Sequence, residues 1–254
     1  MPSRLHRQGE LVVAPEPRCR SAHAAGNPME RAARLAERLI ALAGSLLVHY
    51  NNKSAILLHG RGLTEGAAMP FRFDLLKTIQ AVAVLLRHEG TLQTSTYLRI
   101  IKLLYIAERE CLDRIGRPIT GDRCVAMKNG PILSGVLDLV NGHHMANATW
   151  SRFILRDGFQ IKLKHDPGTS ELNRFEIELL EEISDRYRDW DQWEIVELTH
   201  SFHEWKKNDP GTSSKQIPLM DILEGLGKEA SYTEIVRQAE EREAVEEILR
   251  SLQS

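Results

Sequence analysis

The spacing of apolar residues predicts helices along most of the chain after residue 73. Apolar side chains recur there every three or four positions, as they do on the buried face of a helix. Thr94 or Ser95 is expected to cap the second of these helices, because a side-chain oxygen can accept the free N–H groups of a first turn. The expected helices cover residues 74–87, 96–114, 171–187, 191–207 and 231–252. The last two begin with capping-box pairs, Asp191 with Glu194 and Ser231 with Glu234.

Between the second and third of these helices the pattern changes. A short extended run is expected over residues 123–127. Asn129-Gly130-Pro131 is expected to open a helix up to residue 141, since proline fits the first helical position. Alternating runs on both sides of Asp157-Gly158 predict a β-hairpin. The predicted fold is therefore mainly α (α+β), with one small β-hairpin and a short extended segment.

The first 68 residues differ from the rest of the chain. Residues 1–28 contain four prolines and scattered arginines without an apolar period, so we expect them to be disordered. Residues 29–50 predict an amphipathic helix, and a glycine-rich linker follows up to residue 68. Two interpretations remain open: an interaction helix on a flexible tether, or a start assigned too early, with Met69 as the true start.

The remainder divides at a second break. Asn208-Asp209-Pro210-Gly211 interrupts the helical pattern, because proline and glycine both disfavour a continuing helix. We therefore expect one domain over residues 69–210 and a C-terminal helical extension over residues 211–254.

Composition places the protein among ordinary globular chains. Of its 254 residues, 42% are hydrophobic and 27% are charged, which excludes a wholly disordered protein. No apolar run approaches the roughly 20 residues that span a bilayer. The three cysteines show no metal-type spacing, which favours free thiols in a reducing cytoplasm. The net charge is +4 over residues 1–68 and −6 over residues 69–254, so nucleic acid is not the expected partner of the folded part.

Candidate catalytic chemistry is sparse. His200 and His203 lie three residues apart on a predicted helix, beside Glu197 and Glu204, and could share a metal-binding face. The sequence indicates no third ligand, so we interpret them as structural or solvated histidines, with a metal site as the alternative. Neither the serine motif of α/β-hydrolases nor a glycine-rich phosphate loop is present. We therefore expect a protein that is not an enzyme and uses no cofactor.

Several short motifs occur together, in order, between residues 73 and 205. They are Phe73-Asp74, Lys102-Leu103-Leu104-Tyr105-Ile106-Ala107-Glu108, Gly116-Arg117-Pro118-Ile119-Thr120-Gly121-Asp122, Asn129-Gly130-Pro131, Leu198-Thr199-His200 and Trp205. In this combination, over about half of its length, the chain resembles the Panacea domain of SocA-like antitoxins. Cys124 and Met127-Lys128 depart from the family pattern, in which many members carry an aromatic or acidic residue between Asp122 and the Gly-Pro pair. Residues 1–68 lie outside the resemblance.

The resemblance implies the antitoxin half of a toxin–antitoxin pair, a kind of protein that is also found among phage-associated proteins. Such an antitoxin neutralises a cognate toxin, encoded by a neighbouring gene, through direct protein contact. Some members are thought to act as adaptors that present the toxin to an ATP-dependent protease. Because the toxins of the family are diverse, the resemblance names no particular target. A DNA-binding regulator with a helix-turn-helix-like pair of helices is the alternative, and a metal-dependent enzyme using His200 and His203 is a third.

The polar residues of the motifs allow two interpretations. Lys102, Tyr105 and Glu108 follow one another at three-residue spacing and could lie beside Asp122. In the first interpretation, a buried contact of Lys102 or Tyr105 with Asp122 fixes the loop. In the second, a partner-binding surface consists of Lys102, Tyr105, Asp122, Lys128 and Asn129, to which Trp205 is added as a core anchor or interface residue. The amphipathic helices at 29–50 and 231–252 are further candidates for docking into a partner groove.

Overall fold

The computed structural model of the chain describes residues 70–252 except residue 91. These residues belong to one compact unit, which spans Thr64–Ser254. The disordered segment expected at 1–28, the helix and linker expected at 29–68, and the alternative start at Met69 lie outside the described residues.

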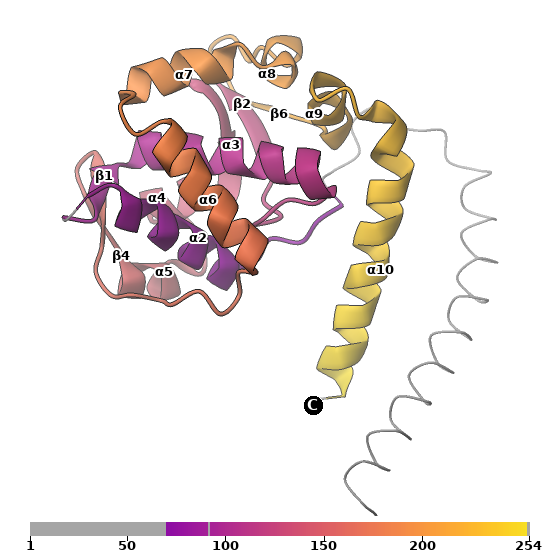
Figure 1. Cartoon of the computed structure of the whole chain (residues 1–254), viewed down its shortest axis with the longest axis horizontal. Coiled ribbons are helices and arrows are strands. Elements are labelled where there is room, and N and C mark those ends of the chain that lie inside the picture. Colours follow the sequence, from indigo (N-terminus) through magenta and orange to yellow (C-terminus); the bar gives the residue numbers. More distant parts are fainter. Residues whose placement is uncertain (1–69, 91, 253–254) are drawn as a thin grey trace, which may run out of the picture. The chain divides into compact units, whose positions relative to one another are not determined.

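Three helices, α2, α3 and α6, pack against one another and supply about half of the hydrophobic core (Figure 1). They comprise Leu75–His88, Tyr97–Ile115 and Arg174–Arg186. α3 is the central helix, because α2, α6, α7 (Gln192–His200) and strand β3 (Gly130–Leu133) all contact it. Every residue from Arg99 to Glu108 is therefore buried, including polar side chains that a surface helix would expose. The candidate site is built on this helix.

The caps of the first two helices show where local sequence decides the structure. Asp74 caps α2 by accepting the backbone N–H of Lys77 at 2.9 Å. α3 is capped by Thr96, so the expected cap at Thr94 or Ser95 is wrong. Both of these residues belong to a short strand, in which their side chains alternate between the two faces.

Two small antiparallel sheets complete the unit. The first has the strand order β1-β5-β4. β4 (Ile154–Asp157) and β5 (Gln160–Leu163) form the predicted hairpin, with Gly158 at a φ of +58° in its turn. β1 (Thr94–Thr96) adds to β5 as a third strand that the sequence does not indicate.

The second sheet has the order β3-β2-β6 and contains a strand where a helix was expected. β2 (Cys124–Met127) confirms the extended segment. The expectation that Asn129-Gly130-Pro131 opens a helix is wrong, because these residues lead into strand β3 (Gly130–Leu133), which pairs with β2. α4 (Ser134–Asn141) begins only after this strand. β3 lies at the edge of this sheet, where proline is tolerated, so Pro131 does not disturb the pairing.

The last third of the described chain is helical, with more breaks than the sequence indicates. The helix expected over residues 191–207 consists of α7 (Gln192–His200) and α8 (His203–Lys207). The Asp191–Glu194 capping box is present at the start of α7. The short helix α5 (Asn147–Phe153) is not indicated by the sequence pattern.

Residues beyond 210 pack onto the same core. β6 (Lys215–Gln216) pairs with β2, and α9 (Leu219–Gly225) buries its apolar side chains. A 3₁₀ turn (Glu229–Ser231) leads into α10 (Tyr232–Ser251), where Ser231 makes no side-chain capping bond, so the second capping box is not formed. The unit is thus mainly α with a small β part, as predicted. In the part of the chain that the structure describes, no helix has the length and apolarity needed to cross a membrane.

Candidate partner-binding site

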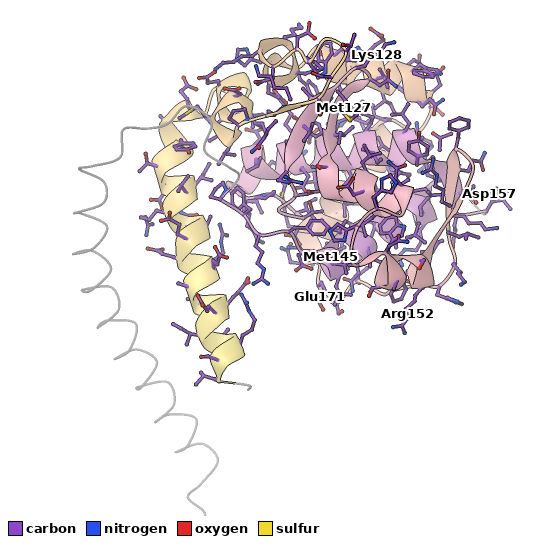
Figure 2. The ribbon with its side chains drawn as sticks, turned by 180° about the vertical axis from the view of Figure 1, so that it is seen from behind. Met127, Lys128, Met145, Arg152, Asp157 and Glu171 are labelled. Atoms are coloured by element: carbon purple, nitrogen blue, oxygen red, sulfur yellow. The ribbon has the colours of Figure 1, made fainter. Side chains whose placement is uncertain are left out.

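The turn between β2 and β3, residues 127–130, carries two of the predicted partner-binding residues at its tip. Met127 pairs with Gly130, so Lys128 and Asn129 form a two-residue connection. Gly130 has a φ of +89°, a conformation that glycine adopts without strain. Lys128 and Asn129 are exposed, and Figure 2 shows Lys128 at the outer edge of the unit, beyond Met127. The tip is therefore accessible to another molecule.

Hydrogen bonds from two helices hold the strands on both sides of this tip. From α3, the Lys102 Nζ donates to the carbonyl of Pro131 at 2.7 Å. From α8, the Trp205 Nε1 donates to the carbonyl of Met127 at 3.0 Å. The indole of Trp205 also stacks on the imidazole of His200, with ring centroids 4.1 Å apart. The β2–β3 turn thus presents its tip from a fixed base.

The backbone of the turn approaches α3 and α7 most closely at Gly130. A Cβ atom at this position would lie 2.6 Å from both the Lys102 Nζ and the Thr199 Oγ1. A methyl group would have to displace an ammonium and a hydroxyl, and the positive φ would add strain. The position therefore requires glycine for space as well as for conformation.

Lys102 is a buried cation whose partner is a carbonyl and not a carboxylate. Its side chain is 0% exposed, and its hydrogen bond goes to Pro131. Burial lowers the pKa of Lys102 from 10.5 to about 7, because the charged ammonium loses its hydration. The side chain therefore exchanges between its charged and neutral forms near neutral pH.

A second buried ionic group joins α3 to α8. Glu204 is 0% exposed, and its Oε1 accepts hydrogen bonds from the Tyr105 hydroxyl at 3.2 Å and from the Arg109 Nε at 2.9 Å. Burial, followed by the negative charge of Glu204, raises the pKa of Tyr105. The Arg109 guanidinium also lies over the ring of Phe202, 4.6 Å from its centroid. These contacts fix the position of α8 and therefore of Trp205.

Two buried carboxylates hold the loop between α3 and β2. Glu108 accepts the backbone N–H groups of Ile119 at 2.5 Å and Thr120 at 2.7 Å. Burial nevertheless raises the pKa of Glu108 to about 7. Asp122 accepts two N–H groups at the start of α4, at 3.0 and 2.9 Å, and burial raises its pKa as well. Asp122 stabilises α4 as a carboxylate at a helix N-terminus, and Glu108 holds the backbone of the loop, so both side chains have structural roles.

The structure divides the predicted partner-binding residues into two groups. Lys102, Tyr105 and Asp122 are buried and support the framework around the β2–β3 turn. No hydrogen bond or ion pair joins Asp122 to Lys102 or Tyr105, so the expected loop-fixing contact is wrong: each of the three has a different partner. Lys128 and Asn129 are exposed and Trp205 is partly exposed. That these three contact a partner stays a prediction.

The two histidines of the alternative metal site have separate surroundings. The His200 Nδ1 lies 3.8 Å from the Glu197 Oε1, and the His203 Nε2 lies 3.4 Å from the Glu224 Oε2. Within residues 70–90 and 92–252, no group of three or more histidine, cysteine, aspartate or glutamate side chains could hold a metal ion. The described cysteines, Cys111 and Cys124, are buried free thiols.

Arg109 is a residue of this framework that sequence reasoning misses. Besides Glu204, it binds the carbonyl of Gly225 through its second Nη at 3.0 Å, and so connects α3 to both α8 and α9. Ninety-five residues separate Arg109 from Glu204, and no local pattern relates them. Their opposite charges are the single sequence signal, and many other pairs in the chain share it.

A comparison with known protein families gives a match that covers the region around the β2–β3 turn. Residues 100–206 match the family model described as antitoxin SocA-like, Panacea domain. The match covers about two fifths of the chain and includes every residue that holds the β2–β3 turn. It confirms the resemblance that the sequence motifs indicate. No curated protein and no solved structure matches the chain.

Proposed function

We propose that the protein, which carries an antitoxin SocA-like domain at residues 100–206, neutralises a cognate toxin by direct protein–protein binding in the cytoplasm. The toxin would be the product of a neighbouring gene. The observation that carries the proposal is the family match, which covers the residues that position the β2–β3 turn. The motif residues have structural roles around this turn, as a binding scaffold requires, and the protein would act without catalysis.

The tip of the β2–β3 turn is the first contact surface that we propose. Lys128 and Asn129 are exposed and directly follow Met127, whose carbonyl binds Trp205. Tryptophan is a residue type that often anchors protein interfaces. Because three helices hold the turn, little conformational freedom is lost when a partner binds, which favours affinity.

α10 supplies the second proposed contact surface. Val245, Leu249 and Leu252 follow one another at helical spacing and are 56%, 48% and 64% exposed. An apolar stripe of this kind suits a groove on another protein. In this proposal residues 69–210 form the common domain, and the extension over residues 211–254 contributes to the choice of toxin.

An adaptor role is the finer part of the proposal. The antitoxin would then hold the toxin at the β2–β3 turn while an ATP-dependent protease degrades it. This mode is recognised by a fall in the amount of toxin when the antitoxin is present, whereas simple binding leaves that amount unchanged.

The proposal is tested by expressing the full chain together with the product of the adjacent gene. We expect the neighbour alone to arrest growth, and this protein to restore growth and to co-purify with it. Lys128→Glu reverses the charge at the tip, and Lys162→Glu makes the same change at an exposed position of β5. Lys128→Glu should weaken both rescue and co-purification, and Lys162→Glu should not. A harmless neighbour that does not co-purify would show that the proposal is wrong.

A further inference from the structure

A cavity of about 410 Å³ lies on a different part of the unit from the β2–β3 turn. Its walls come from the segment that leads into α2, from the loop that follows α3, and from α10. Apolar side chains such as Phe71 and Pro118 line it together with several charged ones. A volume of this size is in the range of small-molecule sites.

Three arginines from the three walls point to the chemistry of this cavity. They are Arg72, Arg117 and Arg242. Among the described residues, Arg72 and Arg242 have no ion pair. Arg117 lies 3.5 Å from the Glu176 carboxylate, which already binds Lys77 at 2.8 Å. One carboxylate therefore serves two cations. Arg242 feels the negative charge of Glu246 without forming an ion pair with it, and Arg72 has no ion pair in the described unit.

Two of these guanidinium groups, those of Arg117 and Arg242, lie close enough to repel each other. The pKa of Arg242 is lowered by partial burial and then by the positive charge of Arg117, while the negative charge of Glu246 acts in the opposite direction. Asp74, Glu243 and Glu246 also line the cavity. Asp74 is engaged as the cap of α2 and Glu246 lies 4.0 Å from Arg250, whereas Glu243 forms no ion pair in the described unit. The lining carries five cationic and three anionic side chains in a unit whose sequence is negative overall.

We propose that this cavity binds a phosphorylated small molecule through Arg72, Arg117 and Arg242. A single carboxylate would satisfy one guanidinium, whereas a phosphate or pyrophosphate carries several charges and several acceptor oxygens that can bridge three. Phe71 and Pro118 offer an apolar wall to the rest of the ligand. This site goes beyond the proposed antitoxin function and does not depend on it.

Isothermal titration calorimetry of the full chain tests the site, with EDTA present and ionic strength held constant. The probes are inorganic phosphate, pyrophosphate, ADP and ATP. Equal affinity for pyrophosphate and ATP would show that the phosphate groups alone are recognised, and tighter binding of ATP would show that the nucleoside contributes. Either result supports the site. The absence of binding of all four probes at about 1 mM would overturn it.

Substitutions then locate the binding. Arg72→Ala and Arg242→Ala each remove a charge-assisted contact and should weaken pyrophosphate binding about tenfold. Both side chains are exposed and form no ion pair in the described unit, so the fold should tolerate their loss. Arg237→Ala is the matched control, because Arg237 lies on the same helix outside the cavity and pairs with Glu234 and Glu241. Equal weakening by Arg237→Ala and Arg242→Ala would show non-specific attraction and refute the proposal. Should Arg72→Ala fail to fold, Arg242→Ala decides alone.

Discussion

Replacing Lys102 by methionine tests whether the centre of α3 contains a destabilising buried charge. Methionine has a similar length and no charge, so Lys102→Met removes the ammonium while it keeps most of the packing. The substitution also removes the hydrogen bond to the carbonyl of Pro131, which costs about 1–3 kcal/mol in the free energy of unfolding. This cost does not vary with pH, whereas the cost of the buried charge does.

The sign of the pH dependence follows from the protons bound in each state. The pKa of Lys102 is about 7 in the folded protein and 10.5 when the side chain is fully hydrated. Between these values the unfolded chain binds more protons, so the free energy of unfolding rises with pH. With 1.36 kcal/mol for each pKa unit, placing Lys102 in the core costs about 4 kcal/mol near pH 7. Near pH 9, where the folded side chain is neutral, the cost is that of removing its proton on folding and falls to about 2 kcal/mol.

Urea denaturation at the two pH values, followed by tryptophan fluorescence, measures this effect. The stability of Lys102→Met relative to the unmodified protein should fall by about 2 kcal/mol as the pH rises from about 7 to about 9. Taking this difference cancels the titration of other groups. The matched control is Lys162→Met in β5, where the side chain is exposed and no such change is expected. A difference for Lys102→Met that stays constant within about 0.5 kcal/mol would refute the reasoning, because the ammonium would then have no burial cost.

Three further substitutions probe the framework around the β2–β3 turn. Gly130→Ala should lower the free energy of unfolding by about 2–4 kcal/mol in urea denaturation, because it combines a positive φ with two contacts at 2.6 Å; a loss below about 0.5 kcal/mol would contradict this. Asp122→Ala leaves two N–H groups at the start of α4 without an acceptor and should cost about 1–3 kcal/mol, measured by thermal unfolding, with an unchanged melting temperature as the contrary result. Trp205→Phe removes the hydrogen bond to the carbonyl of Met127, so amide exchange in the turn should accelerate relative to α2; equal rates in both proteins would show that this bond does not hold the turn.

The long helices of the core can be predicted from the sequence because their signals are local. In α2, an N-cap at Asp74 and a repeating apolar face lie within 15 residues of one another. The β2–β3 turn shows the opposite case. Asn129-Gly130-Pro131 is compatible with a helix start as well as with a tight turn. Hydrogen bonds from Lys102 and Trp205, which are distant in the sequence, stabilise the turn. β1 and β6 have three and two residues, which is too short for an alternating pattern to be recognised.

The sequence identifies the motif residues of the candidate site, but it does not show which of them are buried. Lys102 and Glu108 belong to residue types that usually mark the wet face of a helix. Between Arg99 and Glu108, α3 has no solvent-exposed face, because helices and a strand surround it. Only the tertiary structure contains that information. The sequence likewise does not show that Tyr105 binds Glu204, which is far from it in the sequence, and not Asp122, which is closer along the chain.

The β2–β3 turn contains positions that the fold constrains and positions that can be substituted freely. Gly130 and the carbonyls of Met127 and Pro131 are fixed by contacts with three helices. The side chains of Lys128 and Asn129 make no hydrogen bond to the rest of the described unit, so their exchange leaves those contacts intact. Substitution of these two neighbouring side chains could therefore create a new recognition surface during evolution without lowering the stability of the fold. The same fold could in this way adapt its binding surface when the surface of its partner changes.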